Sequence, residues 1–262
     1  FDMGPAGAAL GKTLAQTLSV VIALWAIRRR QTGIRLSSKD FRPQRVMLSR
    51  ILKIGIPVAV QDGCIQIAFI VITVIANHRG LNDAAAVGIV EKVIGALFIV
   101  PSSMLAAVSA LAAQNIGAGK HDRAAKTLRY AIFITVAYGV VVNLLIQLTA
   151  ESVLGFFTTD AAVILLGSQY IRGYIWDAIF AGVHFCFSGY FCAYGRSYLG
   201  FLHNILSITL VRIPGSYLTS ARFPDTLLPM GMAAPAGSLL SVGICLGAYL
   251  ILKRRGVLQR ET

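Results

Sequence analysis

Three acidic side chains stand out in this sequence because each lies inside a long apolar run. They are Asp62, Glu91 and Asp177. A charge near the centre of a bilayer costs several kcal/mol, so a carboxylate retained there is a functional candidate. Two carboxylates that face one cavity could bind Na⁺ through their oxygens, or could share a proton. We predict that Asp62 and Asp177 bind such a cation, with Glu91 as a third candidate.

The alternative is that each carboxylate pairs with a basic residue for structure alone. Arg212 is the basic residue expected to neutralise Asp177 or another acid. His184 lies two turns beyond Asp177 on the same helical face, where it is either a hydrogen-bonded core histidine or a proton relay. The polar residues that we predict to line the cavity are Gln61, Gln66, Tyr174, His184, Asn204 and Arg212.

The sequence shows few features that would support covalent catalysis. Nucleophile or metalloprotease motifs such as G-x-S-x-G and H-E-x-x-H are absent from the 262 residues. The four cysteines fall in apolar stretches and form no C-x-x-C pair, so they predict neither a disulfide framework nor a metal site. We therefore expect a protein that is not an enzyme and has no cofactor beyond a bound Na⁺ or H⁺.

The elements that must hold these residues are membrane helices. The chain is 56% hydrophobic and only 13% charged, against about 25% charged residues in soluble domains, so much of it must lie in lipid. A membrane helix needs about 20 mostly apolar residues. Seven such runs are predicted, at about residues 5–27, 52–77, 84–113, 128–148, 164–194, 198–219 and 228–252.

The connections between these runs alternate in charge. Eighteen of the 24 Lys and Arg residues fall on one side, in residues 28–53, 120–129, 196 and 253–260, and only Arg79 and Arg222 fall on the other. The positive-inside rule places the first group, and with it the C-terminus, in the cytoplasm. The same distribution argues against nucleic acid as the partner of a chain of net charge +13, because no basic stripe is paired with base-stacking aromatics.

The first and last runs resemble each other. Residues 3–30 and 230–255 both open with Met-Gly, become aliphatic and end in basic residues. Parallel repeats of six helices, as in some secondary transporters, would give this period. The chain also begins with Phe1, on the side predicted to lie outside. We therefore expect a fragment whose first helix closes a preceding lobe that is missing here.

Four stretches of this sequence resemble the multidrug and toxic compound extrusion (MATE) family of transporters. They are the opening GPAGAALG, LKIGIPVAVQDGCIQIAFIVIT at 52–73, the segment 88–126 with its QNIGAGK, and YIWDAIFAGVHFCFSGYFCAYGR at 174–196 followed by LVRIPGSYL at 210–218. The similarity covers nearly the whole chain and is dispersed. Within it, Asp177 in its WDAIF setting resembles the family's acidic position on the tenth helix of the full protein. Family members often carry a carboxylate on the helix of Asp62.

The resemblance implies an all-α, polytopic membrane helix bundle with seven transmembrane helices. Residues 1–30 would be the last helix of a missing N-lobe, residues 31–50 a cytoplasmic linker, residues 51–256 a six-helix C-lobe and residues 257–262 a cytoplasmic tail. The implied function is cation-coupled antiport, with Na⁺ or H⁺ driving export of drug-like organic cations. The implied location is the plasma membrane, a bacterial inner membrane. The implied partners are the lipid bilayer, the substrate and the N-terminal lobe.

Two other functions remain open at this stage. A flippase for lipid-linked oligosaccharides would share the helix bundle but would need a cavity rich in Arg and Lys. An intramembrane enzyme would need metal-ligand clusters or an embedded Ser/Lys pair. The carboxylates favour a cation as the transported or coupling species.

Overall fold

The computed structural model describes residues 4–29, 44–256 and 258. These residues form helices joined by short turns, in two compact units, Phe1–Leu48 and Ser49–Thr262. Most of the predicted linker and most of the predicted tail lie outside the described residues. Residues 45–50, which the sequence analysis placed in the linker, form the first turns of a helix that begins at Arg45.

The first unit contains helix α1 (Gly4–Arg29), which covers the predicted run 5–27. Large apolar side chains are exposed around it, among them Leu14, Leu18, Val20 and Trp25, each more than half exposed. A helix that is apolar all round is typical of a membrane span. The cation of Arg29 lies 4.9 Å from the ring centroid of Trp25 at its C-terminal end.

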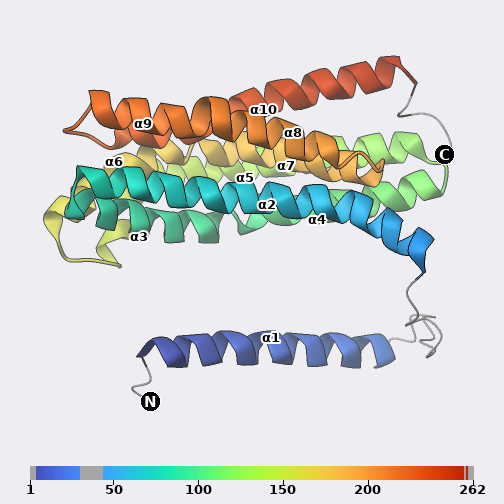
Figure 1. The fold of residues 1–262 in the computed structure, drawn as a ribbon, viewed down its shortest axis with the longest axis horizontal. Coiled ribbons are helices and arrows are strands. Elements are labelled where there is room, and N and C mark those ends of the chain that lie inside the picture. Colours follow the sequence, from blue (N-terminus) through green and yellow to red (C-terminus); the bar gives the residue numbers. More distant parts are fainter. Residues whose placement is uncertain (1–3, 30–43, 257, 259–262) are drawn as a thin grey trace. The chain divides into compact units, whose positions relative to one another are not determined.

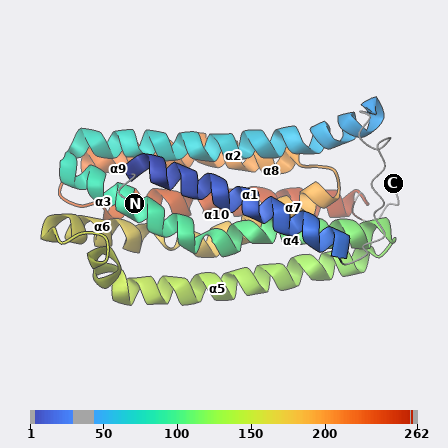
Figure 2. The same ribbon diagram turned by 90° about the horizontal axis from the view of Figure 1, so that it is seen from below.

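The second unit is a helix bundle (Figures 1 and 2). Its elements are α2 (Arg45–Arg79), α3 (Leu81–Leu97), α4 (Ile99–Gly117), α5 (His121–Gly155), α6 (Ala161–Tyr174), α7 (Asp177–Ala193), α8 (Tyr198–Ser207), the π-helical turn η2 (Ile208–Arg212), α9 (Ile213–Arg222) and α10 (Leu228–Arg254). Helices α2 and α5 flank opposite sides of this bundle (Figure 2). Helix α7 lies between them and packs against α4, α5, α8 and α10.

The predicted spans correspond to these helices, several of them broken. Among the described residues five helices are long and apolar enough to cross a membrane, or six if the bent pair α6–α7 is one span. The predicted run 198–219 corresponds to α8, η2 and α9, which follow one another without a gap. Its pieces are each 10 residues or fewer, and all three pack against α10.

The predicted run 84–113 breaks at Phe98, between α3 and α4. Its proline, Pro101, lies in the first turn of α4. A proline is tolerated there because the first backbone N–H groups of a helix have no intrahelical partner. The proline therefore begins the second segment, and the break precedes it.

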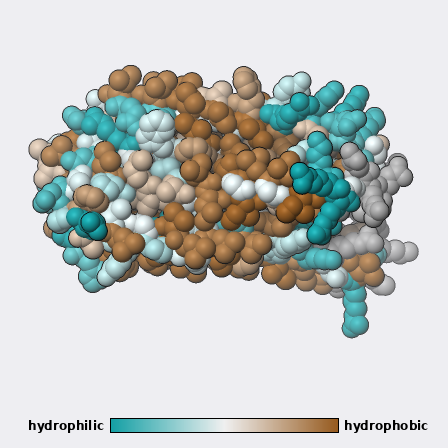
Figure 3. Space-filling view, turned by 90° about the horizontal axis from the view of Figure 1, so that it is seen from above, coloured by the Kyte–Doolittle hydropathy of each residue, from teal (hydrophilic) through white to brown (hydrophobic). Residues whose placement is uncertain are grey.

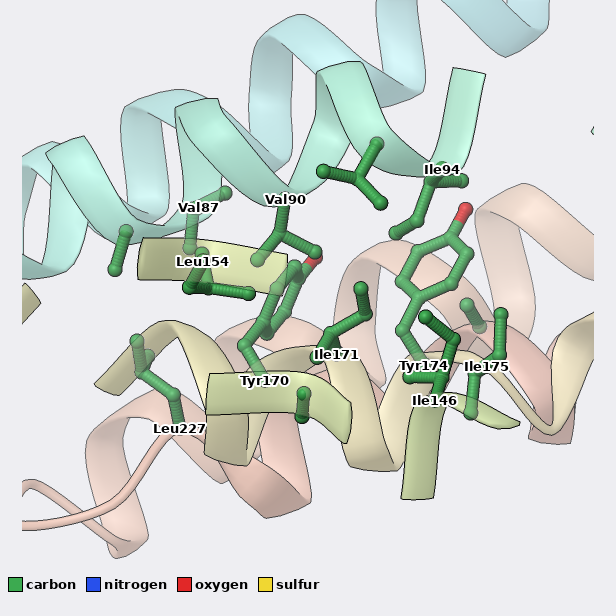
Figure 4. Close-up of a cluster of buried hydrophobic side chains, with 14 of the residues drawn as sticks. Val87, Val90, Ile94, Ile146, Leu154, Tyr170, Ile171, Tyr174, Ile175 and Leu227 are labelled. Carbon is green, nitrogen blue, oxygen red and sulfur yellow. The ribbon is translucent and has the colours of Figure 1, made fainter. Parts of the chain in front are cut away.

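Two apolar cores fill the bundle, one in each half of its length. The first joins α2, α3, α5, α6 and the start of α10 around Ile94, Leu154, Tyr170 and Tyr174. Figure 4 shows Tyr170 and Tyr174 directed from α6 toward Val90 and Ile94 on α3. The second joins α4, α5, α7 and the end of α10 around Phe187, Tyr190 and Phe191. The polar residues described below lie largely between these cores.

Close helix approach in the bundle depends on glycine. A Cβ at Gly189 of α7 would lie 2.4 Å from the carbonyl oxygen of Leu105 on α4, and one at Gly231 of α10 would lie 2.3 Å from that of Tyr170 on α6. Small residues allow such backbone approach in membranes, where dispersion contacts drive helix association. These glycines allow the close packing of α7 against α4 and of α10 against α6.

The two ends of the bundle differ in charge. At one end, where α2 meets α3, the guanidinium of Arg79 donates to Asp83 at 2.9 Å and to the backbone carbonyls of Ser220, Phe223, Pro224 and Thr226 at 2.6–3.3 Å. This Arg79 clamp ties α2 to the loop between α9 and α10. At the other end, the basic end, α4 meets α5 and α10 stops. Exposed basic residues gather here, with the half-buried Arg196: Lys120, Arg123, Lys126, Arg129, Lys253, Arg254 and Arg255.

The outer surface of the described helices is apolar across its middle. Figure 3 shows one face on which hydrophobic residues occupy the centre and hydrophilic ones gather toward the ends. Phe133, Leu148, Leu210 and Leu218 are each at least 64% exposed without belonging to a core. Exposure of that extent needs a lipid solvent. The bundle is accordingly an integral membrane unit.

Candidate cation and substrate site

Asp177 lies where the fifth predicted span is broken. Helices α6 and α7 meet at an angle of 43° across Ile175 and Trp176, and Asp177 begins α7. A negative charge in the first turn of a helix is stabilised by the helix dipole. Broken helices that place such ends inside the bilayer are typical of transporter binding sites. The sequence predicted Asp177 near mid-span but did not predict this break.

The Asp177 carboxylate is buried and incompletely bonded. The residue is 1% exposed, and the groups close enough to act on its charge are Arg212 and the hydroxyl of Ser238. Its Oδ1 has no hydrogen-bond partner among the described residues, and no Lys or Arg of those residues lies within 4.0 Å of it. A buried carboxylate oxygen without a partner is costly, so this atom is the strongest candidate for binding a cation.

No acid within the described part of the chain forms with Arg212 the close ion pair that the sequence predicted. Its Nη2 donates to the hydroxyl of Tyr174, and its guanidinium carbon lies 5.1 Å from the ring centroid of Phe69 and 5.4 Å from that of Tyr174. Two aromatic rings can stabilise a desolvated guanidinium. Arg212 thus leaves Oδ1 of the Asp177 carboxylate without a bonded cation.

The position of Arg212 results from a local widening of its helix. The π-helical turn η2 ends at Arg212, and the amide of Ile213 donates to the carbonyl of Ile208, five residues back. Pro214 follows and has no backbone N–H to donate to the preceding turn. Its position favours an irregular pattern of backbone hydrogen bonds in this part of the helix. Such π-bulges are frequent at functional sites. The sequence identified Arg212 and Pro214 but not the bulge that directs the side chain.

Glu91 is half-buried and faces α2. The hydroxyl of Thr73 lies 3.2 and 3.3 Å from the two carboxylate oxygens of Glu91. The neighbouring Lys92 is exposed, as expected for two adjacent helical residues that point in different directions. Arg212 also acts on the charge of Glu91. Glu91 and Asp177 therefore both lie within the electrostatic influence of Arg212.

His184 belongs to a buried polar row that continues from Asp177. Its Nε2 lies 3.4 Å from Ser238 Oγ, and its ring centroid is 5.3 Å from that of His203. His203 Nε2 in turn lies 2.8 Å from Ser188 Oγ. The sequence predicted that Asp177 and His184 share one face of their helix. That face of α7 packs against Ser238 of α10. Sequence reasoning missed His203, Ser188 and Ser238, although a histidine next to Asn204 in an apolar run was a usable signal.

The polar row holds an unusual number of unsatisfied atoms. Six of the seven described residues with a buried side-chain nitrogen or oxygen that has no partner are Gln61, Asp177, His184, His203, Asn204 and Arg212. Buried polar groups in proteins are nearly always bonded to protein or water. A path for an ion, or for the water that solvates it, requires hydrogen-bond donors and acceptors that are not already paired within the protein. The polar row supplies such groups.

The structure places the two predicted aspartates differently. Asp62 and Gln66 have exposed side chains on α2, whereas Gln61 beside them is 2% exposed. Asp62, Gln66, Phe69 and Thr73 follow an i, i+4, i+7, i+11 pattern and so share a face of α2. That face includes the Phe69 ring against Arg212. A Na⁺ held jointly by Asp62 and Asp177 remains a prediction, and the described residues contain no group of three His, Cys, Asp or Glu placed to ligate a metal.

Comparison with known proteins decides the family. The family model MatE matches residues 57–218, which include Asp62, Glu91, Asp177 and Arg212. This chain belongs to the MatE family. The match agrees with the resemblance read from the sequence and covers most of the second unit.

Individual relatives are distant but match along nearly the whole MatE-family chain. "Probable multidrug resistance protein YoeA" of Bacillus subtilis is 22% identical over 261 residues, which are 98% of this chain and 56% of YoeA. "Multidrug export protein MepA" of Staphylococcus aureus is 24% identical over 255 residues, 97% of this chain and 56% of MepA. The chain thus spans just over half the length of these relatives.

Solved structures share its fold. A multidrug resistance MATE family transporter in an outward-facing conformation superposes with a TM-score of 0.86 at 19% identity, over 96% of this chain and 57% of that one. A MOP superfamily transporter from Pyrococcus furiosus, described as having a binding pocket of reverse polarity, superposes with a TM-score of 0.82 at 19% identity, over 99% of this chain and 58% of that one. The all-α membrane bundle predicted from the sequence is confirmed.

Proposed function

We propose that this chain forms the C-lobe of a cation-coupled antiporter that exports organic cations. Family membership and the names of the relatives support transport over an intramembrane enzyme. The observation that carries the proposal is the unpartnered Oδ1 of buried Asp177, held beside an arginine that is already engaged by Tyr174. A cation is the ligand that would compensate this carboxylate.

Competition for Asp177 would produce exchange. A proton or Na⁺ at Oδ1 removes the negative charge that attracts an organic cation, so the two ligands weaken each other's binding. If the two bind from opposite sides of the membrane, influx of one drives efflux of the other. The coupling cation then biases the lobe between two conformations through its differential affinity for them.

The aromatic rings beside Asp177 fit an organic cation as the substrate. Tyr174 and Phe69 already hold a guanidinium between them, and a planar or amphiphilic cation uses the same attraction to ring faces. A flippase for anionic lipid carriers is the rival. Its interior would be dominated by Arg and Lys, whereas Arg212 here is accompanied by two carboxylates, Asp177 and Glu91.

The complete transporter would include a further lobe. This chain covers 56% of the length of YoeA and MepA, and α1 is a separate unit from the bundle. We assign α1 to the preceding lobe and the basic end, with the C-terminus, to the cytoplasm, because basic connections favour that side of a plasma membrane. Drug export is then a property of the two-lobe protein.

Flux measurements on the two-lobe protein in proteoliposomes test the proposal. A fluorescent organic cation is loaded, and an inward Na⁺ or H⁺ gradient is imposed separately. We expect efflux to follow one gradient and to stop when that gradient is collapsed with the matching ionophore. Efflux that continues without either gradient would overturn coupling, and transport of a lipid-linked anion in place of the cation would support the rival.

A further inference from the structure

The basic end of the bundle contains a pocket that the transport proposal does not use. It has a volume of about 580 Å³ and lies between the start of α5 and the end of α10. Its walls are one face of α5, with Asp122, Lys126 and Arg129, and one face of α10, with Leu246, Tyr249 and Lys253. Spacings of three and four residues place each set on a single helical stripe.

The charges at the rim are unbalanced. Lys126, Arg129 and Lys253 are exposed and form no ion pair within the part of the chain that the structure describes. Asp122 is the one acidic residue among the lining residues. Three basic side chains around one opening favour binding of an anion, and phosphate groups are commonly bound by Lys and Arg.

The floor of the pocket is aromatic and apolar. Phe187 and Tyr190 of α7 are buried beneath it, and the ring of Tyr249 lies 5.8 Å from that of Phe187 and 6.0 Å from that of Tyr190. Leu246 and Ile132 continue this surface along the helices. A free phosphate ion would make no favourable contact with this apolar floor, whereas an acyl chain of a phospholipid could pack against it.

A further polar group in the pocket wall has an open bonding position. His121 Nδ1 lies 3.0 Å from the hydroxyl of Tyr194, which itself donates to the carbonyl of Leu258 at 2.9 Å. These bonds fix the imidazole. Its Nε2 is buried without a partner among the described residues, so it is available to a headgroup oxygen or hydroxyl.

We propose that this pocket binds the headgroup of an anionic phospholipid, with an acyl chain on the floor of Phe187, Tyr190 and Tyr249. Basic pockets between membrane helices on the cytoplasmic side are suited to acidic lipid headgroups. The site lies in the half of the bundle opposite to the Arg79 clamp. It is independent of Asp177 and of the identity of the transported substrate.

Native mass spectrometry of the full chain in detergent tests the proposal. Phosphatidylglycerol and phosphatidylcholine are added at equal concentrations, and inorganic phosphate is the headgroup probe. We expect phosphatidylglycerol to be retained preferentially. The triple variant Lys126→Gln, Arg129→Gln, Lys253→Gln should retain it at least about tenfold less. The matched control Lys120→Gln, Arg123→Gln, Arg254→Gln removes the same charge from the same end, outside the pocket, and should change retention less than about twofold.

A second variant probes the floor. Ala125 lines the pocket, and Ala125→Phe should fill it and lower retention of phosphatidylglycerol while all basic residues remain. Equal losses in the two triple variants would overturn the proposal in favour of diffuse surface attraction. Displacement of the lipid by millimolar inorganic phosphate alone, or equal retention of the two lipids, would also overturn it. Thermal unfolding of each variant identifies any that fails to fold, and the second variant then decides.

Discussion

Helices α2 and α7 both carry an aspartate inside the predicted membrane region, yet their packing differs in almost every respect. Helix α7 is buried along most of its length, including Asp177, His184 and Ser188. Helix α2 exposes Ile56, Ile67 and Ile70 by at least 55% each and exposes Asp62 as well. The comparison shows that the position of a carboxylate along a membrane span does not determine whether the carboxylate is buried. Its burial depends on how the helix that carries it packs against other helices.

The two helices are also held by different means. Backbone contact at Gly189 fixes α7 against α4. Helix α2 is held mainly by side chains near one end, namely Arg79 in its clamp, Thr73 at Glu91 and Phe69 under Arg212. Toward its other end Ser197 Oγ donates to the carbonyl of Lys53 at the long distance of 3.5 Å. A helix anchored more strongly at one end can shift at the other with less loss of packing. We infer that α7 fixes the geometry of the site and that α2 contributes its mobile wall.

The largest expected effect comes from removing the charge on the central helix. Asp177→Asn keeps the shape of the side chain but cannot compensate a cation, so cation-driven efflux by the two-lobe protein should fall at least about a hundredfold, equivalent to roughly 3 kcal/mol. Flux in proteoliposomes is the measurement, with thermal unfolding in detergent as the control for folding. Wild-type efflux by this variant would remove Asp177 from the mechanism.

Breaking the clamp should release α2 without touching α7. Arg79→Ala leaves Asp83, two part-buried carbonyls and two exposed ones without their charged donor, and we expect a loss of about 1–3 kcal/mol in the free energy of unfolding. Arg222→Ala is the matched control, because Arg222 is exposed and makes no hydrogen bond within the described residues. It should change stability by less than about 0.5 kcal/mol. Equal effects in SDS-induced unfolding would contradict the clamp.

Adding one methyl group to each helix contrasts their packing directly. Gly189→Ala would place a Cβ 2.4 Å from the backbone of α4, and overpacking of this kind costs about 1–3 kcal/mol. Gly63 on α2 has nothing within 4 Å of the equivalent position, so Gly63→Ala should be neutral or stabilising by up to about 1 kcal/mol. The same unfolding assay decides, and a reversed order would show that α2 is the more tightly packed helix.

The smallest expected effect comes from the exposed carboxylate. Asp62→Asn should reduce efflux by less than about fivefold, or about 1 kcal/mol, because an exposed carboxylate can exchange one partner for water. Concentration dependence on the coupling cation is the sharper measurement, since a ligand of that cation shifts its half-saturation. A loss as large as that of Asp177→Asn would mean that the two aspartates form one site when both lobes are present.

Much of the architecture follows from the sequence alone. The apolar runs predicted α1, α5 and α10 as continuous spans, and the MatE match agrees with the family indicated by residues such as those of the WDAIF segment. This is possible because the bilayer imposes a length and an apolar composition on every span. The same constraint identified Asp177, Glu91 and Arg212, since a charge in such a run is costly and therefore conspicuous.

The breaks and the partners depend on tertiary structure. The sequence did not predict the bend before Asp177, the π-turn at Arg212, the burial of Asp177 against the exposure of Asp62, or the row through Ser238, His203 and Ser188. Hydropathy averages over a span and does not distinguish a face that meets protein from one that meets lipid, because both are apolar. Only the packing of α7 and α10 against their neighbours, through glycine contacts far apart in the chain, decides which polar groups meet.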